Sequence, residues 1–76
     1  MSEQVLDRVR EIAGSVLERT VTVDDSPSTV EAWDSIKHMN LMLAIEEEFG
    51  FAFLPDEMDE AKSIGQIARL VASKRG

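Results

Sequence analysis

Two side chains near the middle of the sequence, Ser35 and His38, have types and a spacing that could support nucleophilic catalysis. A histidine three residues after a serine could act as the base that activates the hydroxyl. The alternative is structural, because a serine at a helix start caps the backbone, and the histidine is expected to be exposed or packed over the preceding loop. No oxyanion hole or pocket is recognisable beside the pair. We therefore expect no autonomous catalytic activity.

The sequence also lacks the residues of a metal site. His38 is the only histidine and cysteine is absent, which excludes a thiolate site, a thiol nucleophile and a disulfide framework. Counting a calcium loop from Asp56 places Ala61 where glycine is required and Ile67 where glutamate is required. The four glycines are scattered and do not form a phosphate-binding loop. We expect no bound metal.

Length, composition and charge exclude further classes of function. Seventy-six residues support one small domain over residues 1–76, too small for a large catalytic cleft. The net charge of −7 disfavours nucleic acid and anionic membranes as partners, because both require clustered lysine and arginine. Most of the acidity lies in residues 31–60, which carry nine acids and one base. With no apolar stretch of secretory or membrane-spanning length, we expect a cytoplasmic monomer with basic protein partners.

Helical periodicity organises the N-terminal part of the chain. Residues 5–17 predict an amphipathic helix with Ser2 as N-cap and a core stripe of Val5, Val9, Ile12 and Val16, widened by Leu6, Ala13 and Leu17. Gly14 within it predicts the close approach of another helix, since glycine weakens a helix by about 1 kcal/mol. Residues 20–33 break the period and predict a long loop, tied to the core by Val21, Val23, Val30 and Trp33. Trp33 could also be a docking contact, but we favour a plug beneath the loop.

The second predicted helix, residues 36–49, has Ser35 as its N-cap, Asp34 just before it and Gly50 as its C-terminal cap. Its core side is expected to contain Leu41, Ile45 and Phe49, at steps of four. A second apolar stripe, rotated away from the first, is a candidate partner surface of Ile36, Met39 and Leu43. The helix ends in three glutamates, Glu46, Glu47 and Glu48, which oppose the helix dipole and so suggest a role outside the helix.

Two further helices complete the prediction. A short one covers residues 56–61 after Pro55, and a final one opens with a capping box of Ser63 and Gln66. The predicted fold class is all-α. It is a small four-helix bundle of three longer helices and one short helix, with a long loop between the first two.

The tripeptide Asp34-Ser35-Ile36 is followed by an amphipathic helix that closes in Glu-Glu-Glu-Phe-Gly. This combination resembles the acyl carrier proteins and related thiolation domains, whose signature is Asp-Ser-Leu. The helix layout, the long first loop and the length are also similar, so the resemblance covers nearly the whole chain. It implies that a phosphopantetheinyl transferase attaches the 4′-phosphopantetheine arm of coenzyme A to Ser35, with Asp34 helping to present the serine. The thiol of that arm would hold thioesters in a protein that has no cysteine.

The same resemblance implies a partner-facing side of the second helix, formed by Ile36, Met39, Leu43, Glu46 and Glu47. Its partners would be the transferase, an acyl- or aminoacyl-loading enzyme and downstream synthases or transferases. The structural alternatives are a plain capping role for Asp34, core positions for Ile36 and Met39, and a solvated face for the glutamates.

Lys37 and Asn40 stand where fatty-acid carriers tend to be acidic. This departure favours a carrier of a specialised fatty-acid-like, polyketide or secondary-metabolite pathway, and acyl, aminoacyl and polyketide cargoes are all compatible with it. A second hypothesis, from a different class, is an acidic helical adaptor that binds a basic partner protein without a covalent cofactor.

Overall fold

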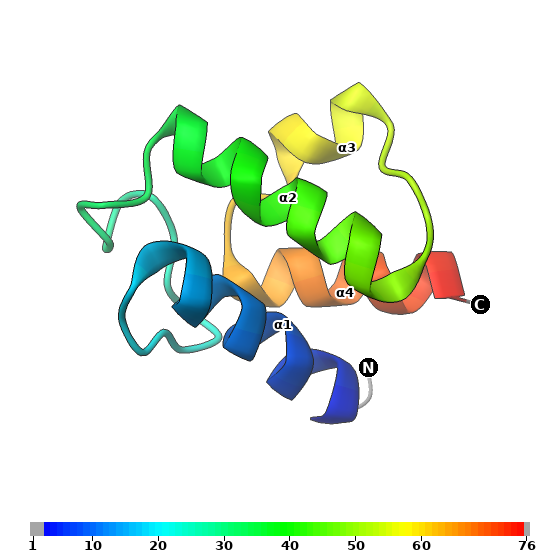
Figure 1. Ribbon diagram of the computed structural model, residues 1–76, viewed down its shortest axis with the longest axis horizontal. Helices are drawn as coiled ribbons and strands as arrows, with labels where there is room; N and C mark the ends of the chain where they lie inside the picture. The colour runs from blue at the N-terminus through cyan, green and yellow to red at the C-terminus, as the bar shows by residue number, and fades with distance from the viewer. Residues whose placement is uncertain (1–2, 76) are drawn as a thin grey trace.

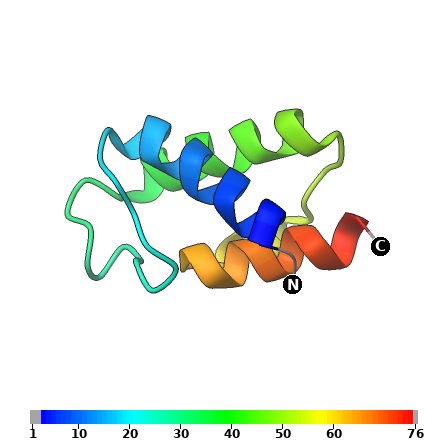
Figure 2. The ribbon, with the colours of Figure 1, turned by 90° about the horizontal axis from the view of Figure 1, so that it is seen from below.

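The computed structural model describes residues 3–75 of the chain. Over that range it contains the helices α1 (Glu3–Leu17), α2 (Ser35–Phe49), α3 (Pro55–Glu60) and α4 (Ile64–Arg75), and no strand. The predicted all-α class, helix order and long first loop are confirmed. α1 packs against both α2 and α4, and α3 lies on the side of α2 away from α1 (Figure 1). Figure 2 shows α1 and α2 as one layer, with α4 against it.

The buried residues of α1 all belong to the predicted stripe, but the stripe is centred away from Ile12 and Val16. The buried residues recur at steps of four, as Val5, Val9, Ala13 and Leu17, whereas Ile12 and Val16 are only partly buried. These two side chains line a groove between α1 and α2, at the edge of the apolar face. The helix begins at Glu3, and the predicted N-cap Ser2 lies outside the described residues.

The segment that approaches Gly14 is the chain just after α1, at Arg19, so the predicted contact with another helix is wrong. A Cβ atom at this position would lie 3.0 Å from the carbonyl oxygen of Arg19. The chain turns back here because Glu18 adopts a left-handed conformation (φ 57°), and the Arg19 N–H donates to the Gly14 carbonyl at 3.1 Å. Gly14 therefore serves the C-terminal end of α1.

The loop between α1 and α2 is held by hydrogen bonds to Asp25. Its carboxylate accepts the Thr22 N–H at 2.8 Å and the Thr29 hydroxyl at 3.0 Å. These two bonds, with the Thr22 N–H as the larger effect, lower the pKa of the Asp25 carboxyl below its ordinary value because they stabilise the charged form. The loop is thus ordered by its own polar side chains.

Apolar contacts tie the same loop to the core. Val21, Val30 and Trp33 are buried as predicted, but Val23 is 39% exposed, so the prediction that it points inward is wrong. The backbone of Val23 forms the contact instead, because its carbonyl accepts the Gly65 N–H at 2.9 Å at the start of α4.

The ends of the later helices follow the predicted capping rules. Gly50 has φ 75° and ends α2, and its N–H donates to the Glu46 carbonyl at 2.8 Å. Ser63 Oγ accepts the Gln66 N–H at 3.1 Å, but the Gln66 side chain returns to the N–H of Lys62 at 3.0 Å instead of to that of Ser63. In the part of the chain that the structure describes, no helix is long and apolar enough to cross a bilayer.

Candidate functional site

The first turn of α2 assigns the capping role to Asp34, so the prediction of Ser35 as N-cap is wrong. Asp34 has an extended backbone, and its Oδ1 atom accepts the Lys37 N–H at 2.8 Å. Aspartate caps a helix as well as serine does, and its charge also suits the positive end of the helix dipole. Ser35 is consequently the first residue of the helix. Its side chain is exposed, and within residues 3–75 its hydroxyl has no hydrogen-bond partner.

Backbone donors beside this hydroxyl suit an anion. The first helical hydrogen bond of α2 runs from the His38 N–H to the Asp34 carbonyl at 2.8 Å. The N–H groups of Ser35 and Ile36 precede that bond and have no acceptor in the described chain. Free N–H groups and the helix dipole together favour a phosphate at a helix N-terminus. The residues present therefore fit a phosphodiester on the Ser35 oxygen.

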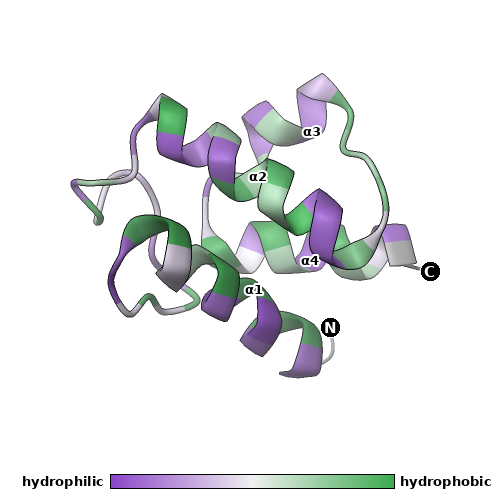
Figure 3. Ribbon diagram, in the orientation of Figure 1, coloured by the Kyte–Doolittle hydropathy of each residue, from purple (hydrophilic) through white to green (hydrophobic). Residues whose placement is uncertain are grey.

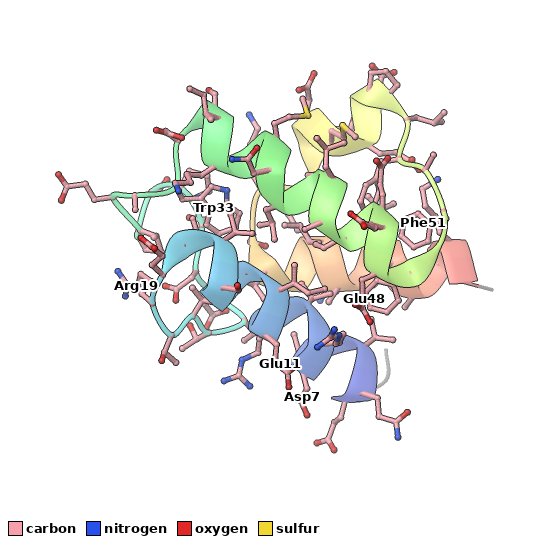
Figure 4. All side chains as sticks on the ribbon, in the orientation of Figure 1. Asp7, Glu11, Arg19, Trp33, Glu48 and Phe51 are labelled. Carbon is pink, nitrogen blue, oxygen red and sulfur yellow. The ribbon has the colours of Figure 1, made fainter. Side chains whose placement is uncertain are left out.

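Trp33 and His38 link the loop, α2 and α3. Trp33 is 2% exposed, which confirms the predicted plug, and its indole N–H donates to His38 Nδ1 at 3.0 Å. The other imidazole nitrogen, Nε2, lies 2.7 Å from the Met58 carbonyl oxygen. Because Nδ1 accepts a hydrogen bond, we assign the proton to Nε2, which donates to Met58. Figure 4 shows Trp33 near the start of α2.

The two hydrogen bonds of His38 test the hypothesis that the histidine activates Ser35. Both ring nitrogens of His38 are directed at Trp33 and Met58, and neither contacts the Ser35 hydroxyl. A general base must be within hydrogen-bond reach of the proton that it removes. The structure therefore gives His38 a structural role that joins three segments.

A cavity of about 430 Å³ lies beside Ser35, between the loop, α2 and α3. The residues that line it include three methionines, the hydrogen-bonded pair of Trp33 and His38, and the serine. They are Met39, Met42, Met58, Trp33, His38 and Ser35. Methionine is flexible and fills irregular spaces, so such a wall can adapt its shape. The positions of Met42 and Met58 in this cavity wall were not predicted from the sequence. Met42 adjoins the predicted core stripe, whereas Met58 sits on a helix too short to show periodicity.

The predicted apolar partner stripe of α2 faces outward. Ile36 is 72% exposed, Met39 48% and Leu43 49%, and hydrophobic residues occur along α2 (Figure 3). The alternative that Ile36 and Met39 are core residues is wrong. The buried side of α2 instead contains Leu41, Met42 and Ile45.

The glutamates of α2 differ in their surroundings. Glu46 is half-buried, and its carboxylate accepts the Phe53 N–H at 2.6 Å. Glu48 points toward α1 and pairs with Arg8 at 2.7 Å, and this hydrogen bond lowers the pKa of the Glu48 carboxyl below its ordinary value (Figure 4). Glu47 is exposed and has no ion-pair partner among the described residues. The unfavourable position of Glu46 relative to the helix dipole is thus explained within the chain.

Comparison with known proteins identifies the family. Residues 7–71 match the family model for a phosphopantetheine attachment site. The chain belongs to the phosphopantetheine-attachment family. The cofactor of this family, 4′-phosphopantetheine, is held covalently, and the exposed first turn of α2 fits its phosphate. In residues 3–75 no three potential metal-ligating side chains come together.

Individual relatives support the same family. An acyl carrier protein of Coprothermobacter proteolyticus is 27% identical over 66 residues, which span 78% of this chain and 80% of that protein. The solution structure of a holo acyl carrier protein from Geobacter metallireducens is 31% identical, covers 93% of this chain and 85% of its own, and superposes with a TM-score of 0.83. A Mycobacterium tuberculosis structure, provisionally described as an acyl carrier protein, shares the fold at a TM-score of 0.82 and 21% identity, over 92% of this chain and 97% of its own.

Proposed function

We propose that this member of the phosphopantetheine-attachment family is an acyl carrier protein in which Ser35 carries the 4′-phosphopantetheine arm. It moves thioester-bound acyl or aminoacyl intermediates between biosynthetic enzymes and performs no catalysis of its own, and residues 1–76 form one carrier domain. The observation that supports this most directly is the capping of α2 by Asp34, which leaves the Ser35 hydroxyl exposed at the helix N-terminus.

The residues of the chain have simple roles in this function. Ser35 supplies the primary hydroxyl that attacks the pantetheine-bearing phosphorus of coenzyme A. The bridging P–O bond of the pyrophosphate breaks and adenosine 3′,5′-bisphosphate leaves, while the transferase supplies Mg²⁺ and the base that takes the hydroxyl proton. The free N–H groups of the first turn and the helix dipole stabilise the phosphodiester that is formed. Asp34 holds the turn in shape. The arm, when bound, supplies the thiol on which cargo is held as a thioester.

The partners of such a carrier are the phosphopantetheinyl transferase, a loading enzyme and downstream synthases or transferases. We place the exposed side of α2 in contact with them, because it starts at Ser35 and bears the exposed apolar side chains Ile36, Met39 and Leu43. Lys37 and Asn40 on this helix favour a specialised pathway over primary fatty-acid synthesis. An acidic adaptor without a cofactor is the competing function.

Intact-mass measurement separates the two functions. The protein is incubated with coenzyme A, Mg²⁺ and a broad-specificity phosphopantetheinyl transferase, alongside the variants Ser35→Ala and Ser28→Ala. Ser28 is a matched control, because it is also an exposed serine, in the loop before α2. We expect one phosphopantetheine on the wild type and on Ser28→Ala, and none on Ser35→Ala. An unmodified wild type would favour the adaptor, and a modified Ser35→Ala variant would place the attachment site elsewhere.

A further inference from the structure

A lysine between α3 and α4 lines the same cavity as Ser35 and carries an unpaired charge. Lys62 is exposed, and within residues 3–75 its ammonium group has no ion-pair or hydrogen-bond partner. By contrast, Lys74 near the end of α4 is paired with Glu57 at 2.8 Å. An exposed lysine is ordinarily solvated and stabilises little. What distinguishes Lys62 is its place in the cavity wall beside the attachment serine.

Hydrogen bonds on both sides of Lys62 fix the path of its backbone. The Lys62 N–H itself donates to Gln66 Oε1 at 3.0 Å, which explains why that side chain does not complete a capping box. Just after it, the Ile64 N–H donates to a carbonyl oxygen of the loop before α2 at 3.0 Å. Just before it, the Met58 carbonyl oxygen lies 2.7 Å from His38 Nε2 on α2. The lysine therefore extends from a backbone that is tied to α2, α4 and the long loop.

The charges around the cavity include a single cation. Among the described residues that line it, Asp34 and Asp59 carry carboxylates and Lys62 carries an ammonium group. His38 is neutral, because its Nδ1 atom accepts a hydrogen bond. The Asp34 carboxylate is directed at a backbone N–H of the first turn of α2. A phosphodiester on the Ser35 oxygen adds one more negative charge to this wall, and Lys62 is the lining residue that can compensate it.

We propose that Lys62 binds the phosphate of the arm on Ser35 and thereby holds the first part of the arm beside the cavity. The inference rests on the proposed function, since only phosphopantetheine on Ser35 provides this phosphate. A phosphodiester has two unesterified oxygens, so the free N–H groups of the first turn of α2 and the ammonium group can each bind one. Lysine suits this role because it places a compact charge with three rotatable donors on a flexible stem.

Asp59 is the competing partner of Lys62 in the same cavity wall. The two residues are three apart at the end of α3, yet their side chains form no ion pair in residues 3–75. A carboxylate is present whether or not the protein is modified, whereas the phosphate arrives with the arm. Comparison of the unmodified and modified protein therefore separates the two partners.

A cycle of modification and mutation measures the coupling between Lys62 and the phosphate. Wild type and Lys62→Gln, each without and with phosphopantetheine as verified by intact mass, are unfolded thermally at low salt and followed by circular dichroism. The change in Tm on modification should be more favourable in the wild type than in Lys62→Gln by roughly 2–5 °C, as for a partly screened ion pair in a small domain. Lys62→Arg keeps the charge and should behave as the wild type. Salt at about 1 M should remove the difference.

Phosphorus NMR observes the phosphodiester directly and does not depend on stability. The resonance of the modified wild type should differ from that of modified Lys62→Gln, and added salt should move the wild-type resonance toward that of the variant.

Two variants provide controls for the loss of one positive charge. Arg69 is exposed on α4, away from the cavity, and Arg69→Gln should give the wild-type result in both measurements. Lys37 is two residues from Ser35 but is not among the residues that line the cavity. Lys37→Gln should therefore keep most of the wild-type change in Tm on modification.

Each outcome decides for or against the inference. Equal changes in Tm on modification and equal phosphorus resonances for wild type and Lys62→Gln would overturn it, while the arm on Ser35 would still support the proposed function. A loss of Tm in Lys62→Gln that is as large before modification as after it would assign the ion pair to Asp59. An equally large effect of Lys37→Gln would show that charge near Ser35, and not Lys62, is what matters. Failure of the transferase to modify the wild type would refute the proposed function, and this inference with it.

Discussion

The N-cap of α2 is the contact on which the geometry of Ser35 depends most directly, and Asp34→Ala removes it. The variant loses the hydrogen bond from the Lys37 N–H to Oδ1, 2.8 Å long, and a negative charge at the positive end of the helix. Loss of such a cap costs about 1 kcal/mol of unfolding free energy. For a domain of this size that corresponds to a decrease in Tm of roughly 4–8 °C.

Asp34→Asn separates capping from charge. Asparagine caps as well as aspartate, so this variant should keep most of the Tm while it loses the carboxylate. Thermal unfolding followed by circular dichroism measures the stability, and the transferase assay measures the accessibility of Ser35. Glu31→Ala is the control, because it removes an exposed carboxylate three residues earlier without removing a cap.

The stability series has a clear refutation. If Asp34→Ala unfolds at the wild-type temperature, the capping bond does not stabilise α2 and the reasoning fails. If Asp34→Asn is as unstable as Asp34→Ala, the charge and not the cap is what matters. A slow transferase reaction of Asp34→Asn at unchanged Tm would show that the carboxylate also contacts the transferase, a role that the resemblance to acyl carrier proteins implies.

Two further predictions concern contacts around α3. His38→Leu removes the hydrogen bonds of the imidazole to Trp33 and Met58 and leaves the buried Trp33 indole N–H without an acceptor. The free energy of unfolding, measured with urea, should fall by about 1–3 kcal/mol. An unchanged urea midpoint would contradict a stabilising role of these two bonds. The ion pair with Lys74 (2.8 Å) holds the pKa of the Glu57 carboxyl below its ordinary value. The stability that this pair gives the folded protein is therefore present above the unfolded-state pKa of Glu57 and is lost as the pH falls through the folded-state pKa. Glu57→Gln should flatten this acid-side loss of stability, and parallel pH profiles of the two proteins would refute the assignment.

Local rules predicted the helices because the relevant signals are local. Periodicity located the three longer helices and Pro55 indicated the short one, and Gly50 and Ser63 were correctly assigned as caps, since a cap depends on a few neighbouring residues. The same rules assigned the cap to Ser35 instead of Asp34, because adjacent residues with equal capping propensity differ only in the path of the chain that enters the helix. For the candidate site, the sequence pointed to Ser35 but did not predict that Asp34 caps the helix and leaves the Ser35 hydroxyl exposed.

Tertiary contacts account for the rest of what the sequence did not predict. Glu46 is used by the Phe53 N–H, a contact that exists only once the segment after α2 has folded back over the helix. Gly14 is required by the carbonyl of Arg19, which approaches because the chain reverses after Glu18. In each case the residue was singled out correctly by a violated local rule, but its partner was not determined by sequence spacing.

The division of roles between Asp34 and Ser35 has a consequence for a protein that is modified at the serine. If Ser35 were the cap, modification of its oxygen would alter the acceptor that holds the first turn of α2. Because Asp34 accepts the Lys37 N–H, the turn keeps its cap while the serine oxygen is esterified. The phosphate is then added where the free N–H groups of Ser35 and Ile36 favour an anion. The proposed modification of Ser35 therefore leaves the cap of α2 in place.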